Sequence, residues 1–259
     1  MAFNPHFYVQ GSEYDALKYL SDSTKAHLFK SWAVPFREKV FPLIDEEPFA
    51  RLYDDKASRP ETPINVLVGA LILKELFDIH DQEVYEKIMF DVSFQYALRT
   101  TTYREQPMDY NSLGLFRERN TAYEAMTGVD LIENCILKLS SELAELMNFC
   151  SQFHHKDAPT IISRIKKMRR MEVLYTSVRN LVKRVDEQGT DTIAKRLRHY
   201  LDENDLRKMI YYCWPEEVDS RTEDLLQDAR RILQTCKTNY DQTSEYLQMI
   251  RVLKEPWRS

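Results

Sequence analysis

The chain has 259 residues and a net charge of −5, and 43% of its residues are hydrophobic, a fraction typical of folded proteins. Its five glycines lie far apart, which excludes the glycine-rich phosphate loops of Rossmann and P-loop proteins and the G-x-S-x-G turn of α/β-hydrolases. Scarce glycine also disfavours a fold with many tight hairpins, so the composition predicts a mainly α protein.

Charge is distributed unevenly along the chain. Residues 1–150 hold 15 Lys and Arg against 24 Asp and Glu, whereas residues 151–259 hold 21 against 17. The acidic total therefore does not exclude an anionic partner. The start of the chain lacks a signal-peptide pattern, and the longest apolar stretch, residues 66–73, is too short to cross a bilayer. We expect a cytoplasmic protein that has no membrane partner.

The N-terminal part is predicted to be helical in short pieces. Residues 1–57 should form an arm and short helices, because Pro42 and Pro48 interrupt the apolar pattern. Thr62 can cap the next helix, with Pro63 at its first position. That helix is apolar nearly all round, so we expect it to be the buried centre of the domain.

Two shorter helices should follow, one capped by Asp81 and one over residues 92–99. After a polar loop, Asn111 or Asp109 can cap a further helix that Gly128 ends. Its pattern assigns Leu113, Phe116, Ala122 and Met126 to the core side and turns Arg117 and Arg119 toward solvent.

The rest of the chain is also predicted to be helical. A long amphipathic helix is expected from Asp130 to about Met147, and the pattern breaks over residues 150–159, where we place a domain boundary. The most periodic segment follows and is closed by Gly189. Its apolar positions are Ile161, Ile165, Met168, Met171, Tyr175, Val178, Val182 and Val185, and three more helices fit residues 190–202, 219–236 and 242–254.

The helices of residues 62–126 have the layout of a helix-turn-helix DNA reader, whose recognition helix enters the major groove by its N-terminal end. Asn111 and Ser112 could bond phosphates or bases, and Arg117 and Arg119 could pair with phosphates or guanines. The alternative is an ordinary solvated helix face that carries two arginines.

A second candidate is the basic stretch over residues 156–184, in which nine Lys and Arg face only two acidic residues. Lys166, Lys167 and Arg170 fall off the apolar stripe, so this face could bind DNA phosphates or an anionic membrane surface, or simply be solvated. A third candidate, His154, His155 and Asp157, could ligate a metal, although adjacent histidines in an irregular linker are usually plain surface residues.

Residues 58–119 resemble the N-terminal domain of bacterial insertion-sequence transposases of the InsH type. The resemblance is carried by Ser58-Arg59-Pro60, an apolar helix that ends in LKEL, a D-x-E-V-x-E-x-I helix, F-Q-Y-A-L, and a helix that contains F-R-E-R. It implies a DNA-binding domain over residues 58–150. Expected DNA contacts are Arg59, Asn111, Ser112, Arg117 and Arg119, joined by Arg164, Lys166, Lys167 and Arg170 of the following segment.

The resemblance continues into a helical region over residues 151–259. In these transposases the first of three catalytic carboxylates lies in a short strand, which implies that Asp157 is a catalytic residue and a metal ligand. Two departures weaken this role: Ala158-Pro159 replaces the usual hydroxyl residue, and the chain stops before the rest of the ribonuclease-H-like sheet. Mg²⁺ is expected for a complete transposase and no cofactor for this chain alone, because two-metal chemistry needs several carboxylates.

We therefore expect the DNA-binding N-terminal portion of a transposase, which recognises terminal inverted repeats and pairs with itself or with a full-length transposase. One alternative is a non-catalytic regulator that inhibits or pairs with a complete transposase. Another is a remnant without function.

Overall fold

The computed structural model describes residues 13–53, 62–150, 153, 156–188, 195–236 and 239–254. Within these ranges the chain is helical and contains no strand, which confirms the prediction of a mainly α fold. It divides into two compact units, residues 1–165 and 166–259. The sequence-based domain boundaries, at residues 57 and 150, stay a prediction.

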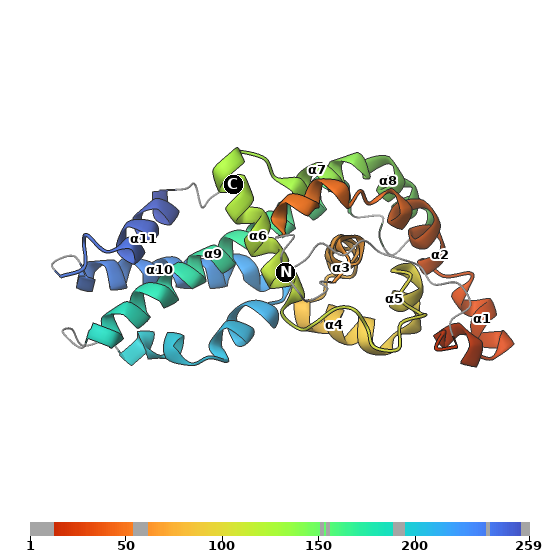
Figure 1. Cartoon of the computed structure of the whole chain (residues 1–259), viewed down its shortest axis with the longest axis horizontal. Helices are drawn as coiled ribbons and strands as arrows, with labels where there is room; N and C mark the ends of the chain where they lie inside the picture. Colours follow the sequence, from red (N-terminus) through yellow and green to blue (C-terminus); the bar gives the residue numbers. More distant parts are fainter. Residues whose placement is uncertain are drawn as a thin grey trace. The chain divides into compact units, whose positions relative to one another are not determined.

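The helices of the first unit run in sequence from an N-terminal series of short turns to the start of the longest helix (Figure 1). They are η1 (Ala16–Tyr19), α1 (Asp22–Leu28), α2 (Ala33–Pro35), η2 (Phe36–Val40), η3 (Phe41–Leu43), η4 (Glu47–Leu52), α3 (Ile64–Phe77), α4 (Asp81–Phe90), α5 (Val92–Ala97), α6 (Ser112–Thr127), α7 (Leu131–Lys138), α8 (Ser140–Phe149) and the first turns of α9 (Ala158–Gln188).

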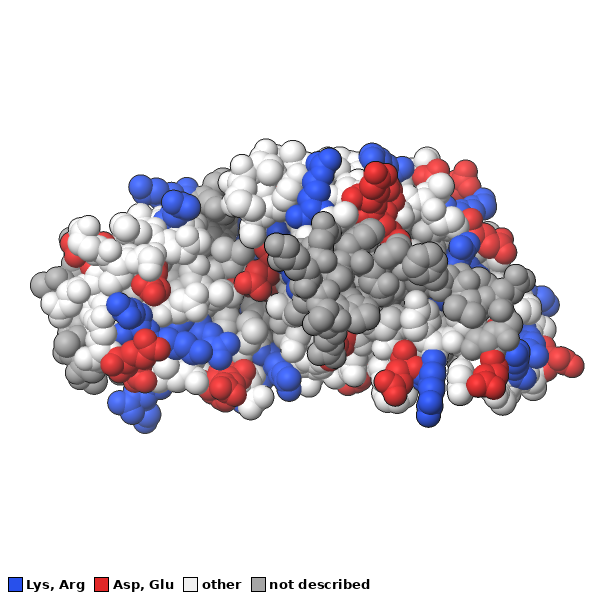
Figure 2. Space-filling model, in the orientation of Figure 1, with Lys and Arg blue, Asp and Glu red and all other residues white. Residues whose placement is uncertain are grey.

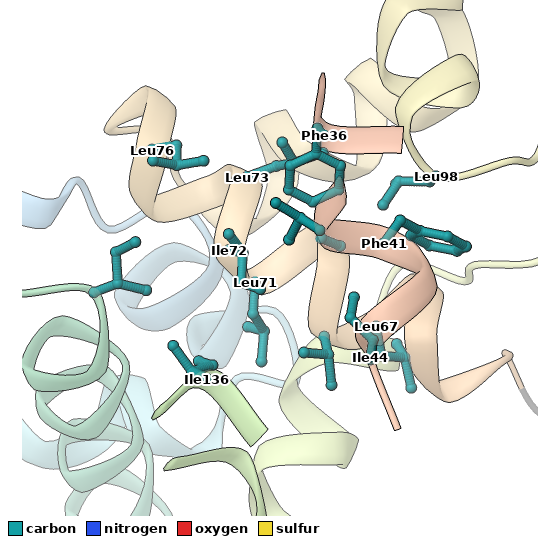
Figure 3. Close-up of a cluster of buried hydrophobic side chains, with 14 of the residues drawn as sticks. Phe36, Phe41, Ile44, Leu67, Leu71, Ile72, Leu73, Leu76, Leu98 and Ile136 are labelled. Atoms are coloured by element: carbon teal, nitrogen blue, oxygen red, sulfur yellow. The ribbon is translucent and has the colours of Figure 1, made fainter. Parts of the chain in front are cut away.

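Helix α3 is the centre of the first unit, as its sequence predicts. Twelve of its fourteen residues are buried, and Figure 1 shows it nearly end-on with α4, α5, α7 and α8 around it. Aromatic and aliphatic side chains from the short N-terminal helices pack against it, together with Leu98 and Ile136 (Figure 3). A helix that is apolar on nearly every side can bury all of its apolar side chains only at the centre of a domain.

One glycine allows a close approach at this centre. A Cβ atom on Gly69 would lie 2.6 Å from Leu98 Cδ2 and 3.5 Å from Phe41 Cδ2. Leu98 and Phe41 are both buried, so neither can swing into solvent to make room. The contact of α3 with these two side chains therefore depends on the absence of a side chain at Gly69.

Two predicted helix caps are wrong. The Thr62 hydroxyl donates to the carbonyl oxygen of Pro107 at 2.8 Å instead of capping α3. Asp81 is the first residue of α4, and its cap is His80, whose Nδ1 accepts the backbone N–H of Glu83 at 3.1 Å. Thr62 and Asp81 both bind partners that are distant in the sequence, Pro107 and Arg117, and local sequence does not predict these contacts.

The later helices of the first unit agree only in part with the predictions from the sequence. Helix α6 ends at Gly128, whose φ of 75° lies in the left-handed region, as predicted. Ala122 and Met126 are exposed, Met126 by 79%, so the prediction that they face the core is wrong. The single helix expected from Asp130 is two helices, α7 and α8, that meet at Leu139.

The second unit contains the rest of α9 and the helices that follow it. These are η6 (Lys195–Leu201), η7 (Arg207–Tyr211), η8 (Pro215–Glu217), α10 (Val218–Cys236) and α11 (Ser244–Lys254). All eight apolar positions predicted from Ile161 to Val185 of α9 are buried, which confirms that stripe. The predicted closure by Gly189 lies outside the described residues. No helix within the described ranges is both long and apolar enough to span a bilayer.

A polar cluster joins the helices of the second unit. The hydroxyl of Tyr175 donates to Asp205 at 2.8 Å, and that of Tyr200 donates to Asp228 at 3.3 Å. His199 Nδ1 lies 2.8 Å from the same Asp205 carboxylate. Burial and the nearby carboxylates raise the pKa of both tyrosines far above the usual range, so they remain neutral donors.

Candidate nucleic-acid interface

The first turn of α6 carries the small polar residues that the sequence placed at a DNA-reading end. Asn111 occupies the cap position but its side chain makes no capping bond, whereas Ser112 Oγ accepts the backbone N–H of Asp109 at 2.9 Å. Ser112 Oγ also lies 3.2 Å from the hydroxyl of Thr62. The start of α6 is therefore tied to the segment that leads into α3.

Arg117 is buried, so the prediction that it faces solvent is wrong. Its side chain is fully enclosed and forms an ion pair with Asp81 of α4, which is 3% exposed. Lys74 Nζ of α3 lies 3.7 Å from the same carboxylate and 3.0 Å from Glu75. These four residues hold α3, α4 and α6 together, and the arginine is not available at the surface for DNA.

The electrostatics of this cluster favour the ionised carboxylate. Burial on its own would raise the pKa of Asp81, but the positive charges of Arg117 and Lys74 outweigh it and lower that pKa below 3.8. Burial likewise works against the charge on Lys74, yet Glu75 and Asp81 raise its pKa above 10.5. The cluster is a balanced set of two cations and two anions in the protein interior.

Arg119 remains nearer to the surface. Its guanidinium carbon lies 4.8 Å from the ring centroid of Tyr53, a cation–π distance, and the residue is half-buried. Arg59, the other arginine that the family resemblance suggested, lies outside the described residues.

Asp157 lies immediately before α9 and is not part of a strand, unlike the first catalytic Asp of the transposases that the sequence resembles. Its exposed carboxylate accepts the backbone N–H of Thr160 at 2.7 Å, and this bonding lowers its pKa below 3.8. Among the residues with described positions, no group of three His, Cys, Asp or Glu side chains could hold a metal ion. The described residues therefore do not assemble a two-metal centre around Asp157, and its catalytic role stays a prediction. His154 and His155 lie outside the described residues.

A second ionic cluster links the end of α3 to the start of α9. Asp78 terminates α3 in the left-handed conformation, with φ 53° and ψ 45°, and forms ion pairs with Lys156 and Arg164. Lys156 Nζ also donates to the carbonyl oxygen of Glu75. Burial of the carboxyl group would raise the pKa of Asp78, but these two cations outweigh it and lower that pKa. The sequence pattern counts Lys156 only as a member of the basic stretch and gives no sign of Asp78, because the partners lie 78 and 86 positions apart.

The basic face predicted on α9 is only partly open to solvent. Arg164 is engaged by Asp78, and Lys167 Nζ lies 3.2 Å from Asp219 in the second unit. Lys166 and Arg170 are half-buried. Among the described residues on the visible face, Figure 2 shows Lys and Arg side chains interspersed with Asp and Glu.

Comparison with protein families finds one similarity, which lies within the first unit. Residues 23–119 match the model of the Transposase domain (DUF772). The match supports a transposase-related family. A search of curated proteins and a search of solved structures each found no match.

The matched segment extends from α1 into α6 and so includes more of the N-terminal part than the 58–119 stretch that carried the resemblance. It contains the core helix α3, the start of α6, and the carboxylates Asp78 and Asp81. Asp157 and the basic residues of α9 lie beyond the matched residues.

Proposed function

We propose that this chain is the DNA-binding N-terminal portion of an insertion-sequence transposase of the InsH type, which recognises the terminal inverted repeats of its element. The observation that carries this proposal is the transposase-domain match over residues 23–119. Within it, α6 begins with Asn111 and Ser112 and carries Arg119 near the surface. A helix that starts with small polar groups suits contact with phosphates and base edges.

The basic residues of α9 would add sequence-independent affinity. Lys166, Lys167 and Arg170 are partly exposed and could each contact a backbone phosphate. Such contacts release condensed counterions, so the binding constant should fall steeply with salt, with a logarithmic slope of about −0.9 for each contact.

The test is a fluorescence-anisotropy titration of the full chain with two labelled duplexes, one carrying a terminal inverted repeat and one with the same composition in scrambled order. Arg119→Gln should weaken binding to the repeat more than binding to the scrambled duplex. The triple change of Lys166, Lys167 and Arg170 to Gln should weaken both and flatten the salt dependence by about 0.9 for each lost contact.

Lys18→Gln is the matched control, because it removes one exposed lysine of the first unit without touching α6 or α9. This variant should bind like the wild type. Binding to neither duplex at low salt would contradict the proposal, and so would an equal loss in the control and the triple variant.

We also propose that the chain alone does not cut or join DNA. Two-metal strand transfer requires several carboxylates around a pair of ions, and Asp157 supplies one. If Mg²⁺-dependent cleavage were observed and then lost in Asp157→Ala, a second copy or a partner would have to complete the site. Cleavage that survives Asp157→Ala would overturn the role given to this residue.

A further inference from the structure

Arg164, at the contact between α3 and α9, was predicted from the sequence to bind DNA. In the structure it pairs with a carboxylate of the same unit. Asp78 ends α3, and Lys156 and Arg164 at the start of α9 both pair with it. Two cations thus converge on one carboxylate, an arrangement that would suit a phosphate equally well, because both anions accept hydrogen bonds from guanidinium and ammonium groups.

The three side chains differ in solvent exposure, and this difference decides which of the two cations could contact DNA. The Lys156 side chain is 1% exposed, whereas those of Asp78 and Arg164 are 41% and 34% exposed. Lys156 is therefore a fixed internal partner of Asp78 and of the Glu75 carbonyl. Arg164 is the member of the cluster that can turn outward and reach a DNA phosphate.

We propose that Asp78 is an autoinhibitory carboxylate, which occupies Arg164 and competes with backbone phosphate for it. This inference rests on the proposed DNA-binding function and concerns its regulation. While Asp78 holds Arg164, neither cation of this cluster is available to DNA at the start of α9. The exposed carboxylate of Asp157, directly before α9, adds a negative charge there. Binding of DNA across this end of α9 would have to displace Asp78 before Arg164 could contribute.

The test is Asp78→Asn, since asparagine tolerates the left-handed conformation at this helix end and removes only the charge. Compared with the wild type, this variant should bind duplex DNA about fivefold more tightly at low salt, the size expected of one exposed ion pair. Its logarithmic salt dependence should become steeper by about 0.9, for one added phosphate contact.

Arg164→Gln separates this mechanism from direct binding. In the wild-type background this change should cost much less DNA affinity than in the Asp78→Asn background, because Asp78 already occupies the arginine. In the Asp78→Asn background it should remove the whole gain. An equal loss of affinity from Arg164→Gln in both backgrounds would show that the arginine contacts DNA without release, and would overturn the proposal.

Glu145→Gln is the matched control for net charge, because Glu145 pairs with Lys39 at 2.7 Å in the same unit and on other helices. It removes one negative charge and releases one lysine, as Asp78→Asn releases one arginine. An equal gain in both variants would mean a general charge effect and would overturn the proposal. Circular dichroism checks that Asp78→Asn is folded. Because this change leaves the buried Lys156 without its counter-charge, an unfolded variant is replaced by Asp78→Asn combined with Lys156→Met.

The two proposals fail in different ways. If neither the wild type nor Asp78→Asn binds DNA at low salt, the proposed function itself is wrong and the inference falls with it. If the wild type binds with strong salt dependence and Asp78→Asn matches it in affinity and slope, only the autoinhibitory role is wrong.

Discussion

Replacing Arg117 by methionine should cause a large loss of stability in the first unit. The arginine side chain is fully buried and its partner Asp81 is 3% exposed. Removing one member of a buried ion pair costs about 3–5 kcal/mol, because the other charge stays in a poorly solvating interior. Lys74 remains 3.7 Å from Asp81, so we expect a loss near the lower end, about 3 kcal/mol.

Urea denaturation followed by far-ultraviolet circular dichroism measures this loss. The double change of Arg117→Met and Asp81→Leu should recover most of it, because Lys74 and Glu75, 3.0 Å apart, then remain as a balanced pair. Lys39→Met, which breaks a pair exposed by more than half on each side, should barely move the midpoint. A loss below about 1 kcal/mol for Arg117→Met, or no recovery in the double variant, would refute the reasoning.

The same pair predicts how stability depends on pH. The folded pKa of Asp81 is lower than its usual value of 3.8, so the unfolded chain binds the proton more readily. The stabilisation from Asp81 is therefore complete above about pH 4 and is lost as the pH falls through the lower folded pKa. In Arg117→Met burial should dominate and raise that pKa, so the variant should lose less additional stability on acidification than the wild type.

Three smaller predictions concern packing, capping and thiol reactivity. Gly69→Val should cost about 2–3 kcal/mol in urea denaturation, because its first added carbon would lie 2.6 Å from Leu98 Cδ2, and a midpoint unchanged from the wild type would contradict this. Asp157→Ala should lower stability by about 1 kcal/mol through loss of the α9 cap, whereas Asp157→Ser, which can still cap, should lose much less. Burial raises the pKa of Cys135 to about 11, so its labelling by a disulfide reagent at pH 8 should be far slower in the native protein than in urea; equal rates would refute it.

Local sequence patterns are enough to predict the helical architecture and much of the core. Helix α3 is apolar on nearly every side, and the apolar positions of α9 repeat every three or four residues, so both buried surfaces follow from local periodicity. The end of α6 at Gly128 also follows locally, since glycine readily adopts the left-handed conformation found there. The family resemblance pointed to a transposase domain, and residues 23–119 match the model of such a domain.

The partners of the charged residues depend instead on how the helices pack. The sequence predicts that Arg117 faces solvent, but α4 places Asp81, 36 positions away, against it. The sequence predicts that Arg164 contacts a DNA phosphate, but the end of α3 places Asp78, 86 positions away, beside it. Periodicity shows which side of a helix is apolar because neighbours along the chain set that property. It cannot show where a charge finds its counterion, because that depends on which helices meet when the core forms.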